Sequence, residues 1–175
     1  MTYRDELVAA MEWLGSRKDT LFVGQAVDFP GTFMYETLSL VPPGKRLEMP
    51  VAEQFQLQFC IGLAQAGYIP ICIYPRQNFM LYALGDIVNT LDKLNTGKVI
   101  IRVASGTTKP VFPGIQHVGD YKSPIANMVN KISVDRVSKG GIVDSYKEAF
   151  VSPVSSIQPG GKLVGEYELG TCRQS

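Results

Sequence analysis

The chain has 175 residues, of which 45% are hydrophobic and 19% are charged, and its 17 basic and 16 acidic side chains leave a formal net charge of +1. This length corresponds to one domain, and the apolar content is sufficient for a folded core. Because the chain has no excess of positive charge, we expect neither nucleic acid nor an anionic membrane surface as a partner.

The single histidine, His117, and the three cysteines exclude a structural zinc site. Cys60, Cys72 and Cys172 are far apart in the sequence and form no C-x-x-C pair. An odd number of cysteines, two of them in apolar stretches, favours reduced thiols, as in the cytosol. The first residues do not resemble a signal peptide, and no apolar run approaches the roughly 18 residues of a membrane span. We therefore expect a soluble, cytoplasmic protein.

Helices and short apolar strands alternate along the predicted chain. Helices are predicted at residues 1–16, 53–66, 80–94 and 142–150, and strands at residues 20–24, 71–74, 99–103, 132–137 and 162–169. Short apolar strands that alternate with helices indicate a parallel sheet covered on both faces. The sequence therefore predicts a single α/β domain over residues 1–175, with three layers and a mostly parallel, doubly wound sheet.

The segment 53–66 has two competing patterns. Its first residues alternate between polar and apolar, as in a strand. Over its whole length, however, Phe55 and Phe59 belong to one helical stripe, and Leu57 and Ile61 belong to a second. We interpret the segment as a helix that is apolar on two sides, which implies either deep packing or burial in an interface.

The common nucleotide-binding and hydrolase motifs are absent. The sequence contains no G-x-x-x-x-G-K-[ST], no G-x-G-x-x-G and no G-x-S-x-G. Composition and spacing alone therefore indicate only a soluble α/β domain.

Several short motifs nevertheless follow one another in a characteristic order. A Pro-x-x-Glu turn ends at Glu53, and Gly62, Ala64, Gly67 and Pro70 follow it; then come Asn78-Phe79, IIRVASG at residues 100–106, and GIQH at residues 114–117. This series resembles the pyrimidine-binding domain of transketolase-like thiamine-diphosphate enzymes. Its spacing is nearest to that of the β subunit of 2-oxoacid (pyruvate-type) dehydrogenase first components. The resemblance is strongest over residues 20–120.

The resemblance implies thiamine diphosphate as the cofactor and assigns roles to four side chains. Glu53 would hydrogen-bond the pyrimidine ring nitrogen across a subunit boundary and promote the imino form that removes the thiazolium proton. Phe79 would stack on the pyrimidine ring. His117 would stabilise oxyanions or donate a proton to the substrate adduct, and Gln116 would accompany it in the same loop.

Each of these residues also has an ordinary structural interpretation. Glu53 can simply complement the positive N-terminal end of its helix. Burial would raise its pKa and favour the neutral acid, whereas the helix N-terminus opposes that shift. Phe79 can be a core residue, and His117 an exposed loop residue. Tyr82, one helical turn after Phe79, is assigned to the core.

Part of the cofactor site of the resembling enzymes is missing from this sequence. In those enzymes a second domain holds the diphosphate and its magnesium ion through Gly-Asp-Gly and a later Asn, a ligand set suited to an octahedral oxygen site. Gly85-Asp86 and Gly119-Asp120 both lack the second glycine. The resemblance therefore implies a partner chain that carries this diphosphate motif and the magnesium, in a homo- or hetero-oligomer.

The function that follows from the resemblance is one half of a split enzyme. The chain would be the pyrimidine-binding subunit of a thiamine-diphosphate-dependent 2-oxoacid dehydrogenase or transketolase-type enzyme. It would act on a 2-oxo acid or a ketose through a cofactor-bound carbanion, and would be inactive alone.

Two alternatives stay open at this point. The chain can be a non-catalytic assembly or regulatory subunit, which the missing diphosphate half favours and which Glu53, Phe79 and His117 oppose. It can also be a domain that binds another small molecule at the ends of its strands, because fold does not fix function.

Overall fold

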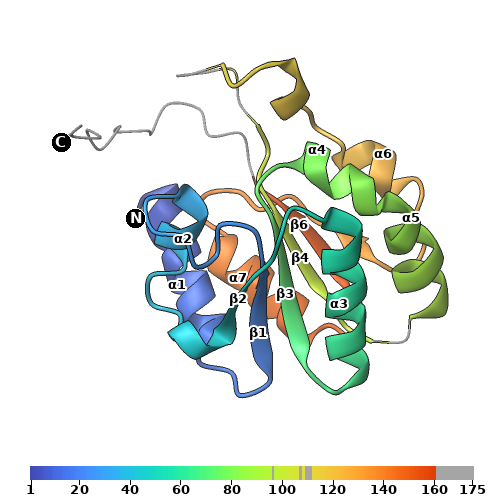
Figure 1. The fold of residues 1–175 in the computed structure, drawn as a ribbon, viewed down its shortest axis with the longest axis horizontal. Coiled ribbons are helices and arrows are strands. Elements are labelled where there is room, and N and C mark those ends of the chain that lie inside the picture. Colours follow the sequence, from blue (N-terminus) through green and yellow to red (C-terminus); the bar gives the residue numbers. More distant parts are fainter. Residues whose placement is uncertain (96, 107, 109–111, 161–175) are drawn as a thin grey trace.

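The computed structural model describes residues 1–95, 97–106, 108 and 112–160 (Figure 1). Six strands form one sheet in the order β2-β1-β3-β4-β6-β5, and all of its described pairings are parallel. The strands are β1 (Thr20–Gly24), β2 (Arg46–Glu48), β3 (Ile69–Tyr74), β4 (Ile100–Val103), β5 (Ser133–Val134) and β6 (Ser156–Pro159). The predicted single α/β domain with a doubly wound parallel sheet is confirmed.

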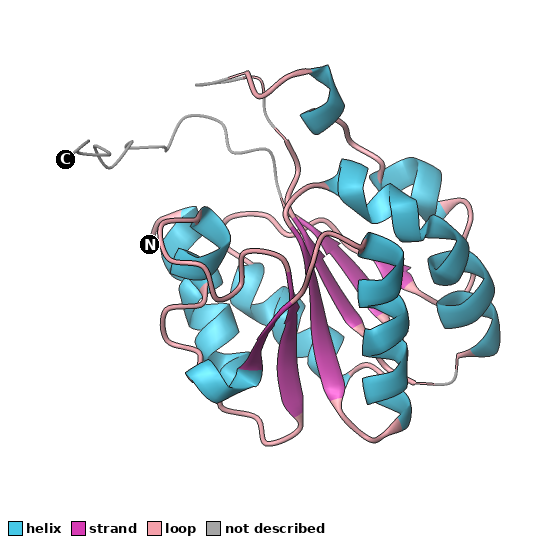
Figure 2. Cartoon of the chain, in the orientation of Figure 1, coloured by secondary structure: helices cyan, strands magenta, loops and turns pink. Residues whose placement is uncertain are grey.

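Helices cover both faces of this sheet (Figure 2). The helices are α1 (Tyr3–Gly15), α2 (Phe33–Thr37), α3 (Glu53–Gln65), α4 (Gln77–Met80), α5 (Leu84–Asp86), α6 (Lys122–Ala126) and α7 (Ile142–Val151). Helices α1, α2 and α7 pack on one face, and α3 to α6 pack on the other. Successive residues of the central strands point to opposite faces, so Ile100 belongs to the first core and Ile101 to the second.

The first helix begins at a capping box. The Thr2 hydroxyl accepts a hydrogen bond from the Asp5 N–H at 3.1 Å, and the Asp5 carboxylate accepts one from the Thr2 N–H at 2.8 Å. One turn on, the Glu6 carboxylate accepts from the N–H groups of Gly140 at 2.9 Å and Ile142 at 3.3 Å. Glu6 therefore ties α1 to the start of α7, more than 130 residues away in the sequence.

Two predicted elements differ in the structure. The helix predicted at 80–94 is helical but irregular: a 3-10 turn (Leu81–Ala83) and a π-helical segment (Ile87–Asp92) interrupt it, and Gly85, a poor helix former, lies between them. The strand predicted at 132–137 is formed only at Ser133–Val134. The strand predicted at 162–169 lies outside the described residues.

Strand β6 and helices α2 and α6 were not predicted from the sequence. Strand β2 was implied only by the Pro-x-x-Glu turn, which follows the end of a strand in the resembling domain.

The described ranges contain no helix with both the length and the apolar composition that a membrane crossing requires.

Candidate functional site

Four segments that follow the carboxyl ends of adjacent strands define the candidate site. Gln25 follows β1, Glu53 opens α3 after β2, Phe79 lies in α4 after β3, and His117 lies in the loop after β4. Because the strands are parallel, these segments reach the same edge of the sheet, where Figure 1 shows the start of α3 and the helix α4. The strand order reverses between β1 and β3, and ligands of open α/β sheets bind at such a switch point.

Glu53 is the first residue of α3 and is half-buried. Its Oε1 accepts a hydrogen bond from Nε2 of Gln25 at 3.4 Å. Its backbone carbonyl accepts one from the Tyr74 hydroxyl at 2.9 Å. Burial raises the pKa of Tyr74 far above its ordinary value, so the phenol stays a neutral donor. The ends of β1 and β3 therefore fix the position of Glu53.

A second polar residue of α3 anchors the helix to the sheet. Gln56 is fully buried, and its Nε2 donates to the Ile73 carbonyl at 3.0 Å and to Sγ of Cys72 at 3.3 Å. Its Oε1 has no hydrogen-bond partner among the described residues. This role was not predictable from the sequence, because a glutamine beside apolar residues resembles an exposed helix position.

The structure brings Phe79 and His117 together. Their rings are 5.4 Å apart between centroids and meet edge to face, with an interplanar angle of 81°. Both residues are half-buried, whereas Gln116 is exposed. Two of the residues singled out in the sequence, 38 positions apart, thus form one aromatic pair at the edge of the sheet.

A buried glutamine that sequence reasoning missed connects α4 to the strand beside it. The Gln77 side chain donates from Nε2 to Oγ of Ser105 at 2.6 Å and accepts from the Tyr121 N–H at 2.7 Å. Its backbone N–H donates to the Ala104 carbonyl at 3.0 Å. Gln77 therefore links the start of α4, which carries Phe79, to the chain on both sides of the His117 loop.

Gly106 allows the His117 loop to lie against the end of β4. A Cβ atom at this position would stand 1.7 Å from the backbone oxygen of His117 and 2.8 Å from its carbonyl carbon. Heavy atoms do not approach so closely, so only glycine fits without moving the loop.

Glu53 and the Phe79–His117 pair form two separate groups. Among the described residues, no hydrogen bond or ring contact joins Glu53 to either of them. The assignment of Tyr82 to the core is wrong: it is 74% exposed, because the 3-10 turn rotates it away from the sheet. Within the part of the chain that the structure describes, no three His, Cys, Asp or Glu side chains gather as metal ligands.

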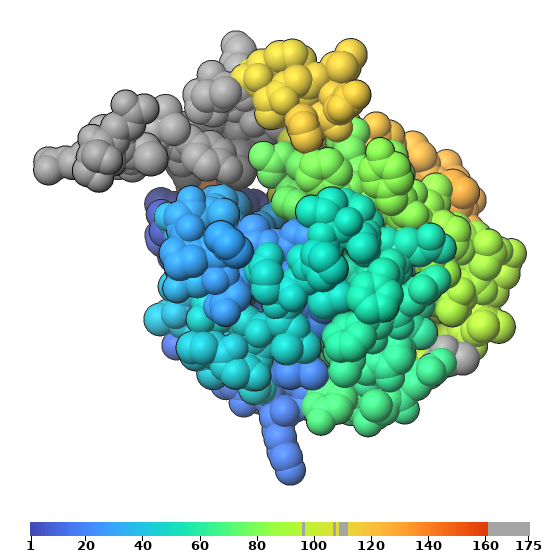
Figure 3. Space-filling model, in the orientation of Figure 1, coloured from blue at the N-terminus to red at the C-terminus, as the bar shows by residue number. Residues whose placement is uncertain are grey.

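Helix α3 presents an apolar stripe to solvent. Phe55 is 54% exposed and Phe59 is 38% exposed, with 6.4 Å between their ring centroids. On the opposite side of the helix, Leu57 and Ile61 are buried against the sheet. Figure 3 shows α3 at the surface of the molecule. The prediction that both stripes are deeply packed is therefore wrong for a single chain. Burial of the Phe55–Phe59 stripe in an interface is the alternative that stays.

At the level of sequence, no protein-family model and no curated protein matches the chain. Several solved structures match it in fold. A split-gene transketolase, described as an inactive β4 tetramer, matches 93% of this chain with a TM-score of 0.71 and 18% identity. A Mycobacterium smegmatis protein, described as a candidate thiamin diphosphate-dependent enzyme, matches 87% of this chain with a TM-score of 0.62 and 16% identity.

These matches show that the chain shares its α/β fold with a split transketolase and with the mycobacterial protein. The chain spans 52% of the length of the split transketolase chain and 31% of that of the mycobacterial chain. At this level of identity the likeness concerns the fold, and activity has to be argued from the site itself.

Proposed function

We propose that this chain is the pyrimidine-binding half of a split thiamine-diphosphate-dependent enzyme. The observation that carries the proposal is the position of Glu53, at the start of a helix on the carboxyl edge of the sheet, in a fold shared with thiamine-diphosphate enzymes. Its substrate would be a 2-oxo acid or a ketose, for which the bound cofactor supplies the nucleophilic carbon.

The described residues fit a pyrimidine ring. Glu53 is half-buried, and among the described side chains only Gln25 donates to its carboxylate, at Oε1, which leaves Oε2 available to a ring nitrogen. Gln25 would hold the carboxyl group in place, since its amide donates to the other oxygen. Phe79 offers a half-buried aromatic ring, and His117 beside it would donate a proton to, or stabilise negative charge on, the substrate oxygen.

The same residues do not fit a diphosphate with its magnesium ion. Magnesium prefers oxygen ligands from carboxylates, amides and phosphates, and no such acidic cluster occurs among the described residues. A partner chain with Gly-Asp-Gly and a later Asn would supply this half of the site. That the structural match is to a split-gene transketolase supports such an arrangement.

The second candidate function is a non-catalytic assembly subunit. Two observations favour it: the exposed stripe of α3, and the similarity to a transketolase chain described as an inactive tetramer. The effect of Glu53→Gln on turnover and on thiazolium proton exchange separates this candidate from the first.

We expect the full chain to self-associate through the stripe of α3. Burying an exposed Phe contributes about 1.5–3 kcal/mol, so the double variant Phe55→Ser, Phe59→Ser should weaken association about a hundredfold or more. Light scattering across a concentration series measures this. Leu40→Ser, which removes an exposed apolar side chain away from α3, is the matched control and should associate like the wild type. A wild-type chain that stays monomeric at high concentration would contradict the prediction.

We expect the chain alone to bind thiamine diphosphate weakly or not at all. Stacking on Phe79 and one carboxyl contact would replace only part of what a magnesium-held diphosphate contributes. Isothermal calorimetry with magnesium present should show no saturation up to about 1 mM cofactor. A dissociation constant of about 1 mM corresponds to a binding free energy of only about 4 kcal/mol. Tight, magnesium-dependent binding to the single chain would mean that it holds its own diphosphate site.

A further inference from the structure

A buried arginine that has no counter-charge among the described residues lies on the sheet face opposite Glu53. Arg102, in β4, is only 3% exposed. Its Nη2 donates to Oγ1 of Thr37 at 2.6 Å, and its Nη1 has no hydrogen-bond partner in the described part of the chain. The Thr37 hydroxyl gives its own proton to the Met34 carbonyl at 2.8 Å, so it is a neutral acceptor. Neither contact balances the charge of the guanidinium.

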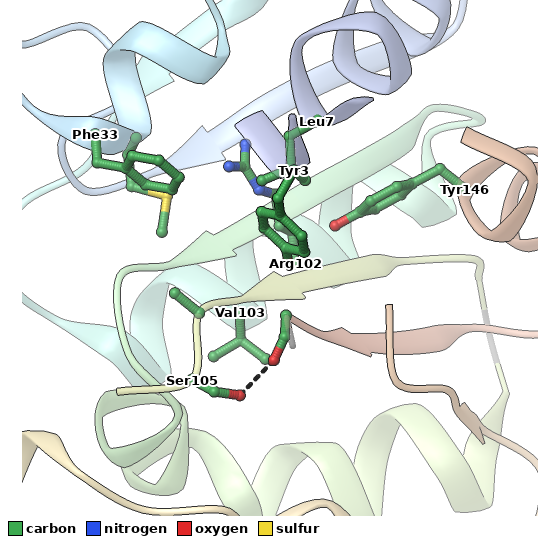
Figure 4. Close-up of a pocket in the computed structure, with 10 residues that line it drawn as sticks. Tyr3, Leu7, Phe33, Arg102, Val103, Ser105 and Tyr146 are labelled. Carbon is green, nitrogen blue, oxygen red and sulfur yellow. Dashed lines mark hydrogen bonds between the residues drawn. The ribbon is translucent and has the colours of Figure 1, made fainter. Parts of the chain in front are cut away.

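Arg102 lines a small cavity between β4 and the helices α1, α2 and α7 (Figure 4). Its described lining includes Tyr3, Phe33, Ser105 and Tyr146. Among the described residues that line the cavity, Arg102 is the one charged side chain. Burial lowers the pKa of Arg102, but an arginine keeps its proton at neutral pH. An uncompensated buried charge is strongly unfavourable, so a balancing anion is expected here.

The buried acidic residue of α1 is already engaged. Glu6, in α1, uses its carboxylate oxygens on the N–H groups of Gly140 and Ile142. Glu6 therefore serves the start of α7 rather than the guanidinium.

Tyr146 supplies a second donor at the same place. It is 1% exposed, and in Figure 4 its hydroxyl is directed toward Arg102. No hydrogen bond to this hydroxyl is found among the described residues. Burial raises the pKa of Tyr146 above its ordinary value, so the phenol keeps its proton. Ser105, in contrast, already donates its proton to the Gly160 carbonyl at 2.6 Å.

We propose that this cavity binds a small monovalent anion between the Arg102 guanidinium and the Tyr146 hydroxyl. Nη1 of Arg102 has no hydrogen-bond partner among the described residues, Tyr146 lines the same space, and no described lining residue is acidic. The cavity volume is about 20 Å³, enough for one or two water-sized groups. This size fits a chloride ion or a single carboxylate group better than a phosphate ester.

The test measures the melting temperature of the full chain in increasing sodium chloride or sodium formate. Sodium gluconate, whose anion is too large for the cavity, serves as the reference at equal ionic strength. We expect a saturable rise with chloride and formate that gluconate does not give, because a ligand that binds only the folded state stabilises it. In parallel, chloride-35 NMR should show line broadening by the wild type. Formate should reverse that broadening if both anions share the site, and a broadening that formate leaves unchanged assigns the site to chloride.

Three variants locate the effect. Arg102→Met should lose the saturable rise and the broadening. Tyr146→Phe keeps the charge but loses one donor, so its half-saturating anion concentration should increase about tenfold. Arg46→Met is the matched control: Arg46 is also mostly buried, but Asp28 lies 3.4 Å from it and balances its charge. The control should respond like the wild type.

An absent saturable response in the wild type, or an equal response in Arg102→Met, overturns the proposal. If Arg102→Met does not fold, an unchanged half-saturating concentration in Tyr146→Phe overturns it instead. Neither result depends on thiamine diphosphate, because the cavity and Glu53 lie on opposite faces of the sheet.

Discussion

Replacing Glu53 with Gln is expected to reduce turnover of the reconstituted complex by about a hundred- to ten-thousand-fold, the usual cost of losing a proton-transfer role. Gln keeps the size of the side chain and its place at the start of α3, but it cannot share an acidic proton with a ring nitrogen. The direct measurement is the exchange of the cofactor's thiazolium proton with deuterated water, in wild-type and variant complexes matched for cofactor occupancy.

Assembly and stability of the Glu53→Gln complex should change little, because a first-turn carboxylate contributes only about 0.3–1 kcal/mol through the helix dipole. Glu36→Gln is the matched control, since Glu36 is a surface carboxylate paired with Arg4, on a helix that packs on the sheet face opposite α3. Unchanged exchange and turnover in Glu53→Gln would leave Glu53 as a helix-start residue only. If neither complex accelerates exchange, the non-catalytic subunit becomes the better account.

Elements with a strong apolar pattern were predictable from the sequence. Strand β1 and helix α7 are formed close to the predicted residues, and β4 contains most of the predicted run 99–103. Strand β6 was missed because Ser156 and Gln158, which are fully or almost fully buried, resemble loop residues. Their burial comes from pairing with β4 and β5, which is a tertiary effect that no local period reveals.

The candidate site was predictable only where a motif marks it. Glu53, Phe79 and His117 were found through the ordered motifs, and the structure joins the last two. Gln25 and Gln77 were missed because each acts through partners 28 or more residues away: Glu53 for Gln25, and Ser105 and Tyr121 for Gln77. A polar residue next to a strand or turn does not reveal a long-range hydrogen bond in the sequence, because the bond depends on which strands lie side by side.

The second large effect is expected from Gly106→Ala, which adds a single methyl group beside the backbone of His117. The new Cβ would overlap the His117 carbonyl oxygen, 1.7 Å away, so the loop that carries His117 has to move. A displacement of about 1 Å at a catalytic group can cost about a hundredfold in rate. We therefore expect turnover of the reconstituted complex to fall about a hundredfold, with thiazolium proton exchange, which depends on Glu53, largely retained.

This division between the two measurements distinguishes a displaced His117 from a general loss of structure. Gly44→Ala is the matched control, because a Cβ at Gly44 meets no atom within 4 Å, and it should leave both rates unchanged. The variant His117→Ala should reproduce the turnover defect of Gly106→Ala, and combining the two substitutions should add little, since both remove the same interaction. If Gly106→Ala turns over at the wild-type rate, the close packing of the His117 loop on the end of β4 is not required for the reaction. If proton exchange and turnover fall together, the substitution has disturbed the whole carboxyl edge rather than His117 alone.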